Sequence, residues 1–79
     1  MISEYVECGL RKARYDMLED GSSVAEVPGL GGVIATAKTI EMCRAQLAEV
    51  IEEWVLIRVA RGLKVPTLDG IEVRVTGKP

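Results

Sequence analysis

The segment closest to a chemical motif is residues 32–39, which read Gly-Val-Ile-Ala-Thr-Ala-Lys-Thr. It has the spacing of the phosphate-binding loop GxxxxGK[ST], in which backbone N–H groups and a lysine hold nucleotide phosphates. That loop needs a second glycine so that the chain can wrap the phosphates, and Ala37 stands at that position. The intervening residues are β-branched or small, which favours an extended strand. We therefore expect a strand followed by a capped helix, and no nucleotide site.

Carboxylates are the next candidates, because paired acids can serve acid–base or two-metal chemistry when a pocket holds them. Glu49, Glu52 and Glu53 crowd one helical turn, and Glu41 lies earlier on the same predicted helix. On an amphipathic helix such a group is more typical of the solvated face. The cluster then becomes interesting as an acidic patch for a basic protein, since complementary charge speeds association and favours the correct partner.

Nucleophilic catalysis lacks a base, because the chain contains no histidine. Cys8 and Cys43 lie within helical patterns and form no C-x-x-C motif, so we expect neither zinc binding nor a reactive thiol. They could form one bridge or stay as two buried free thiols, and we expect the thiols of a reducing cytosol. The hydroxyls of Ser22, Ser23 and Thr36 have no neighbouring base either. We therefore predict no catalytic residue, no metal, no cofactor and no enzymatic activity.

The composition is that of a small, weakly acidic protein. A chain of 79 residues makes one domain at most, and a core of that size is marginal on its own. A net charge of −2 and only three aromatic residues disfavour direct nucleic-acid binding, which depends on basic charge and base stacking. Neither a secretory leader nor a membrane-spanning run is recognisable. We expect a cytoplasmic protein.

The elements that position these groups can be traced by periodicity. Residues 1–12 should form a short helix, since apolar residues recur there at helical spacing. Alternation then predicts strands at 13–18 and 23–27, and Asp20-Gly21 between them is a strong hairpin signal.

The most distinctive local feature is the Pro/Gly loop at residues 28–32. Pro28 ends the second strand, because it has no N–H to donate to the ladder. Glycines at positions 29, 31 and 32 let the backbone reverse, and a third strand follows over 33–37. The three strands should make an antiparallel meander.

A long amphipathic helix should begin after Thr39, a good N-cap, and end before Gly62, a good C′ residue. We expect its apolar stripe to lie across the sheet, with Trp54 as the largest core residue. The stripe consists of Ile40, Cys43, Leu47, Val50, Trp54 and Ile57. Val55, Leu56 and Val59 fall outside this stripe. These three residues give the helix more apolar surface than one stripe provides. The N-terminal helix should cover part of this extra apolar surface, and the rest predicts subunit contacts in a dimer or tetramer.

Ile71, Val73 and Val75 alternate with charged residues and predict a final strand. The chain then reads as an α+β fold, an antiparallel β-β-β-α-β sheet with one long amphipathic helix packed on it plus the short N-terminal helix. We expect a single domain over residues 1–79, with the β-β-β-α-β core at 13–75.

The element order and the loop together resemble the HicB-like antitoxin domain. In that family a strand ending in Pro-(Asp/Glu)-Leu-Pro-Gly leads to a strand, a Ser/Thr cap and a Glu-rich helix. The runs that carry the resemblance are Tyr15-Asp16-Met17-Leu18, Ala25-Glu26-Val27-Pro28-Gly29-Leu30-Gly31-Gly32-Val33 and Ala35-Thr36-Ala37-Lys38-Thr39-Ile40-Glu41-Met42-Cys43. This chain departs from the pattern at Gly29, Gly31 and Ala37, where the family commonly has an acid, a proline and a glycine.

The resemblance implies a partly degraded ribonuclease-H-like fold without nuclease activity, since the acids Asp16, Glu26 and Glu72 are scattered. It also implies a protein partner, HicA, which is a small basic ribonuclease toxin. Many HicB-like antitoxins continue into a DNA-binding segment, whereas this sequence ends at Pro79, so we expect no direct DNA contact. Alternatives are an orphan oligomeric domain without a toxin and, less favoured, a small nuclease. The residues expected to contact the toxin are Pro28, Gly29, Leu30, Gly31, Gly32, Glu49, Glu52 and Glu53.

Overall fold

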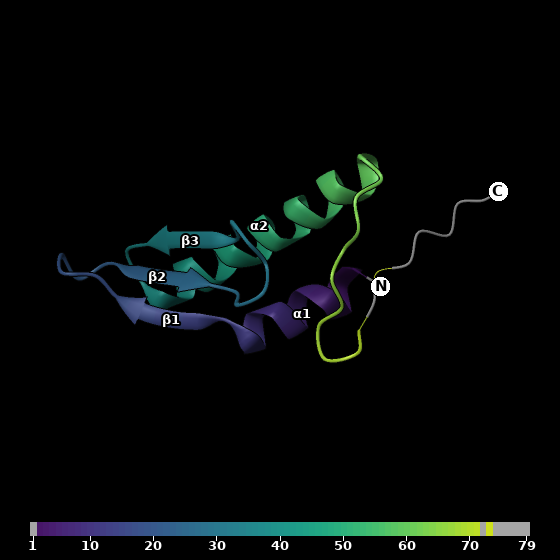
Figure 1. The fold of residues 1–79 in the computed structure, drawn as a ribbon. Helices are drawn as coiled ribbons and strands as arrows, with labels where there is room; N and C mark the ends of the chain where they lie inside the picture. The colour runs from purple at the N-terminus through teal and green to yellow at the C-terminus, as the bar shows by residue number, and fades with distance from the viewer. Residues whose placement is uncertain (1, 72, 74–79) are drawn as a thin grey trace.

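The computed structural model describes residues 2–71 and 73, which form two helices and one three-stranded sheet (Figure 1). The elements in chain order are α1 (Ile2–Lys12), β1 (Arg14–Met17), β2 (Ser23–Glu26), β3 (Ile34–Ala37) and α2 (Ile40–Ala60). Their type and order agree with the sequence prediction. The α+β fold class is therefore confirmed.

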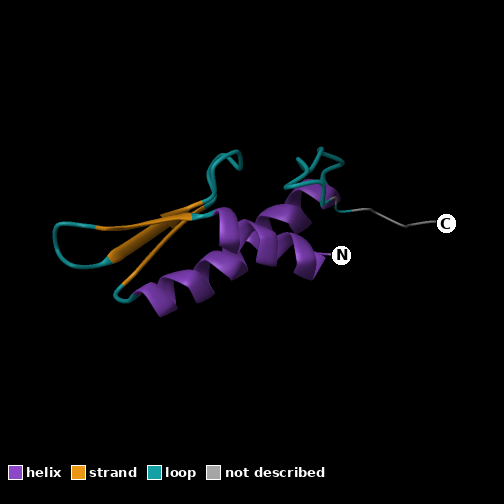
Figure 2. Ribbon diagram, turned by 90° about the horizontal axis from the view of Figure 1, so that it is seen from below, coloured by secondary structure: helices purple, strands orange, loops and turns teal. Residues whose placement is uncertain are grey.

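The sheet is an antiparallel meander in the order β1-β2-β3. Tyr15, Ala25 and Ala35 stand opposite one another in its register. Buried Ala25 and Ala35 belong to the hydrophobic core. Helix α2 crosses one face of the sheet, and the other face carries no helix in the described part of the chain (Figure 2).

The turn between β1 and β2 confirms the Asp20-Gly21 prediction. Gly21 has φ +88°, and its N–H donates to the carbonyl oxygen of Leu18 at 2.9 Å. The Asp20 carboxylate accepts from the Ser22 hydroxyl at 2.6 Å and from the Ser22 N–H at 3.0 Å. These two bonds, the hydroxyl bond first, lower the pKa of Asp20.

Both ends of α2 are capped where the sequence predicted. Thr39 Oγ1 accepts from the backbone N–H of Met42 at 3.1 Å. At the other end Gly62 has φ +70° and donates to the carbonyl of Val59, while Leu63 donates to the carbonyl of Arg58. This pair of bonds is a Schellman motif, which satisfies carbonyls that have no partner within the helix.

The buried face of α2 differs from the predicted stripe. The fully buried residues are Cys43, Leu47, Ile51 and Val55, each four positions after the last. Predicted stripe members Ile40, 45% exposed, and Ile57, 48% exposed, lie largely in solvent, and Val50 and Trp54 are half-buried. An i, i+4 row rotates by roughly 40° per step around a helix. The start of α2 therefore faces the sheet, and its second half faces α1.

Helix α1 approaches α2 closely at Gly9. A Cβ atom at Gly9 would lie 2.9 Å from Ile51 Cδ1, nearer than carbon atoms pack. The glycine that weakens α1 as an isolated helix thus permits its contact with α2.

A C-terminal strap, residues 63–71, returns from the end of α2 across α1 (Figure 1). Tyr5 donates its hydroxyl to the carbonyl oxygen of Pro66 at 2.5 Å, and Leu68 is buried in the core. Ile71, predicted to begin a final strand, instead pairs with Leu68 across a tight turn. Residues 72, 74 and 75 of the predicted strand lie outside the described residues.

Candidate protein-binding surface

The Pro/Gly loop at residues 28–32 consists of two consecutive reverse turns. Leu30 donates to the carbonyl of Val27 at 3.1 Å, and Val33 donates to the carbonyl of Leu30 at 3.2 Å. Gly29 and Gly32, with φ +91° and +86°, occupy the third position of each turn, where a positive φ is needed. Hydrogen bonds in both turns define the shape of the loop.

Leu30 is not available to a partner, because only 3% of it is exposed. It joins the hydrophobic core between the two turns, so its prediction as a partner contact is wrong. The sequence pattern indicated no direction for this side chain, since the loop was expected only to reverse the chain. Pro28, Gly29, Gly31 and Gly32 are exposed, and they are the part of the loop that another protein can touch.

The acidic cluster lies on the exposed side of α2, as predicted for a solvated face. Glu49, Glu52 and Glu53 are all exposed, and Leu56 and Ile57, 51% and 48% exposed, follow within the next turn. The fully buried row of α2 faces the sheet and α1, so helical geometry places these three glutamates on the opposite side of the helix. The Pro/Gly loop, at one end of the sheet, and the acidic cluster are therefore two separate exposed features.

The residues predicted as subunit contacts differ in how far they are exposed. Val55 is fully buried in the core, because the second half of α2 faces α1, and it cannot contact another subunit. Val59 is half-buried, and Leu56 has half of its surface exposed.

Trp54 is half-buried rather than a fully enclosed core residue. The guanidinium carbon of Arg58 lies 4.9 Å from the centre of its ring, within the range of a cation–π contact. The same Arg58 donates from Nε to the carbonyl of Lys64 at 2.7 Å. Arg58 thereby joins the Trp54 ring to the start of the C-terminal strap.

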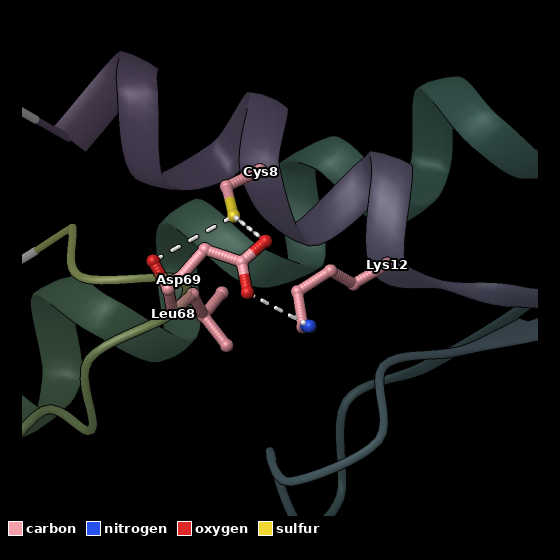
Figure 3. A network of polar contacts seen from close by, with 4 residues as sticks. All are labelled: Cys8, Lys12, Leu68 and Asp69. Carbon is pink, nitrogen blue, oxygen red and sulfur yellow. Dashed lines mark hydrogen bonds and ion pairs between the residues drawn. The ribbon is translucent and has the colours of Figure 1, made fainter.

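Both thiols are free and buried, which confirms the expected alternative to a disulfide. The Cys43 thiol donates to the carbonyl of Ala35 at 3.4 Å, and burial raises its pKa. The Cys8 sulfur lies 3.8 Å from Asp69 Oδ2, and Asp69 pairs with Lys12 at 3.1 Å (Figure 3). A buried thiol with a raised pKa is a poor nucleophile, so Cys43 serves packing.

Alkaline pH should destabilise the fold through Tyr5 and Cys43. Burial raises the pKa of Tyr5 above 10.0 and that of Cys43 above 9.0; the Cys8 thiol adds to the Tyr5 shift. The folded chain keeps protons that the unfolded chain releases, so the free energy of unfolding falls as pH rises past these ordinary values. Urea denaturation at about pH 7.5 and about pH 10.5 measures the fall. A Tyr5→Phe/Cys43→Ala variant should lose less stability over that interval; an equal loss would assign it to other groups.

A shallow hollow of about 410 Å³ lies on β1 and β2. Its lining includes Arg14, Asp16 and Glu26, which are exposed charges of both signs. Among residues 2–71 and 73, no group of three or more His, Cys, Asp or Glu side chains could hold a metal ion. Within the same residues, neither helix combines the length and apolar character needed to cross a bilayer.

Two comparisons identify similar proteins. A family model described as UPF0150-like matches residues 4–66, a span that includes the Pro/Gly loop and the acidic cluster. The crystal structure of TTHA0281 from Thermus thermophilus has 31% sequence identity and a TM-score of 0.87, over 96% of this chain and 95% of that chain. No curated protein matches the sequence.

Proposed function

This chain belongs to the UPF0150-like family, and from that premise we propose that it is a protein-binding module of the HicB-like antitoxin kind. Its partner is a HicA-like toxin, a small basic ribonuclease, which it neutralises by covering the surface that binds RNA. The observation that carries the proposal is the exposed acidic cluster of Glu49, Glu52 and Glu53 on α2.

Charge and shape both support such contact. The carboxylates project from one face of a helix that is capped at both ends, so their spacing is maintained without a partner. Leu56 and Ile57 add exposed apolar surface beside them, and a binding site normally combines a charged rim with apolar area. A basic ribonuclease supplies the opposite charge, which raises the association rate and disfavours acidic competitors.

Reversing the acidic cluster should weaken toxin binding. The variant Glu49→Lys/Glu52→Lys/Glu53→Lys replaces attraction by repulsion at positions that are exposed, so its fold should be retained. We expect the dissociation constant for a HicA-like toxin encoded beside this gene to rise at least about tenfold, which corresponds to about 1.4 kcal/mol. Calorimetry at about 0.15 M salt, where exposed charges are screened beyond about 8 Å, measures it.

Glu7→Lys is the matched control, because Glu7 is an exposed acid on α1, away from the cluster. It should bind like the unmodified chain. Protection of mRNA from cleavage by the same toxin provides the functional readout. A folded chain that neither binds this toxin nor protects mRNA would refute the antitoxin proposal.

A further inference from the structure

The two outer edges of the sheet differ in how they are protected. Val27 donates its N–H to the carbonyl of Val33, so the odd-numbered residues at the start of β3 point their backbone groups toward β2. Backbone directions alternate along a strand. The N–H and C=O groups of Ile34 and Thr36 therefore point away from β2, to the free edge of β3.

The other edge, on β1, is blocked by its own side chains. Leu18 donates to the carbonyl of Ser22, so even-numbered residues bond toward β2, and Met17 points its N–H outward. That outward N–H is already paired with Asp16 Oδ1 at 2.8 Å. Charged Arg14 and Asp16 are also exposed along β1. Exposed charged side chains, and backbone N–H groups already bonded to a side chain of their own strand, prevent an edge from pairing with another strand.

The β3 edge has none of these devices. Its sequence, Ile34-Ala35-Thr36-Ala37, contains no charge and no proline, and 53% of Ile34 is exposed. In the described part of the chain, the sheet ends at β3. An uncharged edge strand with free backbone groups is a template for another strand.

Helix α2 adds apolar surface beside the same edge. Cys43 lies beneath β3, where its thiol meets the Ala35 carbonyl. One flank of α2 packs on α1 through Ile51, on the β1 side of the molecule (Figure 1). Helical geometry places Met42 on the opposite flank, next to the β3 edge. Met42 is 54% exposed.

We propose that β3 pairs in antiparallel fashion with β3 of a second copy of this chain, about a two-fold axis through Ala35. Outward groups at positions 34 and 36 are symmetric about 35, so Ile34 meets Thr36 of the partner subunit and all of these groups become paired. The two Ala35 residues then form the closely spaced pair at the axis, where their small side chains fit above the α2 helices. The two three-stranded sheets become continuous.

The second copy is the best occupant for two reasons. The edge is self-complementary in hydrogen bonding and carries no charge that would repel its own copy. Strand pairing of this length alone buries less area than a stable interface needs, and the two exposed Met42 flanks supply apolar area beside it. The pairing is centred on the first turns of α2. Glu49, Glu52 and Glu53 lie further along the helix, so the pairing of β3 does not involve the acidic cluster proposed to contact the toxin.

Thr36→Pro tests the pairing, because proline removes an N–H that faces solvent in the single chain and leaves the β2–β3 ladder intact. We expect sedimentation equilibrium to show a two-fold assembly for the unmodified chain and a dissociation constant at least about tenfold weaker for Thr36→Pro. Met17→Pro is the matched control at the β1 edge, and it should associate like the unmodified chain. Circular dichroism checks that each variant folds.

Amide hydrogen exchange on the unmodified chain gives a second readout that needs no variant. Above the dissociation constant, the Ile34 and Thr36 amides should exchange slowly and the outward Tyr15 amide quickly, and dilution should abolish the difference. A chain that stays monomeric at about 1 mM, or an assembly in which these two amides remain unprotected, would overturn the proposal. Dissociation by Leu56→Glu but not by Thr36→Pro would place the interface on α2 instead. None of these outcomes requires the toxin.

Discussion

Replacing Leu47 with alanine should remove a large part of the stability of the domain. Leu47 has no exposed surface and lies in the part of α2 that packs against the sheet. Truncating a buried leucine to alanine destabilises a protein by about 2–5 kcal/mol, because apolar contacts are lost and a cavity remains. A chain of 79 residues has a total stability of only about 4–12 kcal/mol. Urea denaturation followed by circular dichroism measures the loss directly.

Leu56→Ala on the same helix is the matched control. It makes the same chemical change at a residue that is 51% exposed, and it should alter stability by less than about 0.5 kcal/mol. Equal losses at the two positions would contradict the assignment of the buried face. The comparison also separates burial from helix propensity, since both variants replace leucine by alanine within α2.

The features that could be predicted from the sequence are those determined by local stereochemistry. Thr39 and Gly62 mark the ends of α2 because one side chain and one positive φ satisfy backbone groups within a few residues. Asp20-Gly21 and Pro28 define turns for the same reason. A second local signal, Asp69-Gly70, forms the turn in the C-terminal strap with φ values of 48° and 80°, and its residue types alone indicate that turn.

The buried face of α2 could not be predicted, because it depends on what lies next to the helix. Apolar residues follow both a 3-4-3-4 stripe and an i, i+4 row, and both include Cys43 and Leu47. Helix α1 covers the flank beyond Ile51, which places Val55 in the core and leaves Ile57 in solvent. Helical periodicity gives the number of apolar faces but not the position of a second helix.

The same limit applies to the candidate binding surface. The Pro/Gly loop and the acidic cluster were recognisable from composition, and both are exposed apart from Leu30. The direction of Leu30 follows from two consecutive turns, which were not distinguished in the sequence. Protection of the two sheet edges is also invisible in the sequence, because it depends on which residues bond toward β2.

Replacing Gly9 with valine should destabilise the fold by about 1–3 kcal/mol, the usual result of adding methyl groups to a close-packed site. A Cβ at Gly9 already meets Ile51 Cδ1 at 2.9 Å and Leu68 Cδ1 at 3.8 Å, so valine pushes α1 away from both α2 and the C-terminal strap. Helix propensity acts in the opposite direction, since glycine is the poorer helix former. A measured loss therefore reports packing and not the intrinsic preference of α1.

A double-mutant cycle with Ile51→Ala identifies the contact responsible. Ile51→Ala alone should cost about 2–5 kcal/mol, because Ile51 is fully buried. In Gly9→Val/Ile51→Ala the carbon atoms added to one helix replace those removed from the other, so the double variant should be more stable than the sum of the single losses by about 0.5–3 kcal/mol. Additive losses would mean that valine at position 9 is accommodated elsewhere. A favourable coupling would establish that the approach of α1 to α2 is limited by these two positions, and that glycine is required there for close packing rather than for backbone freedom.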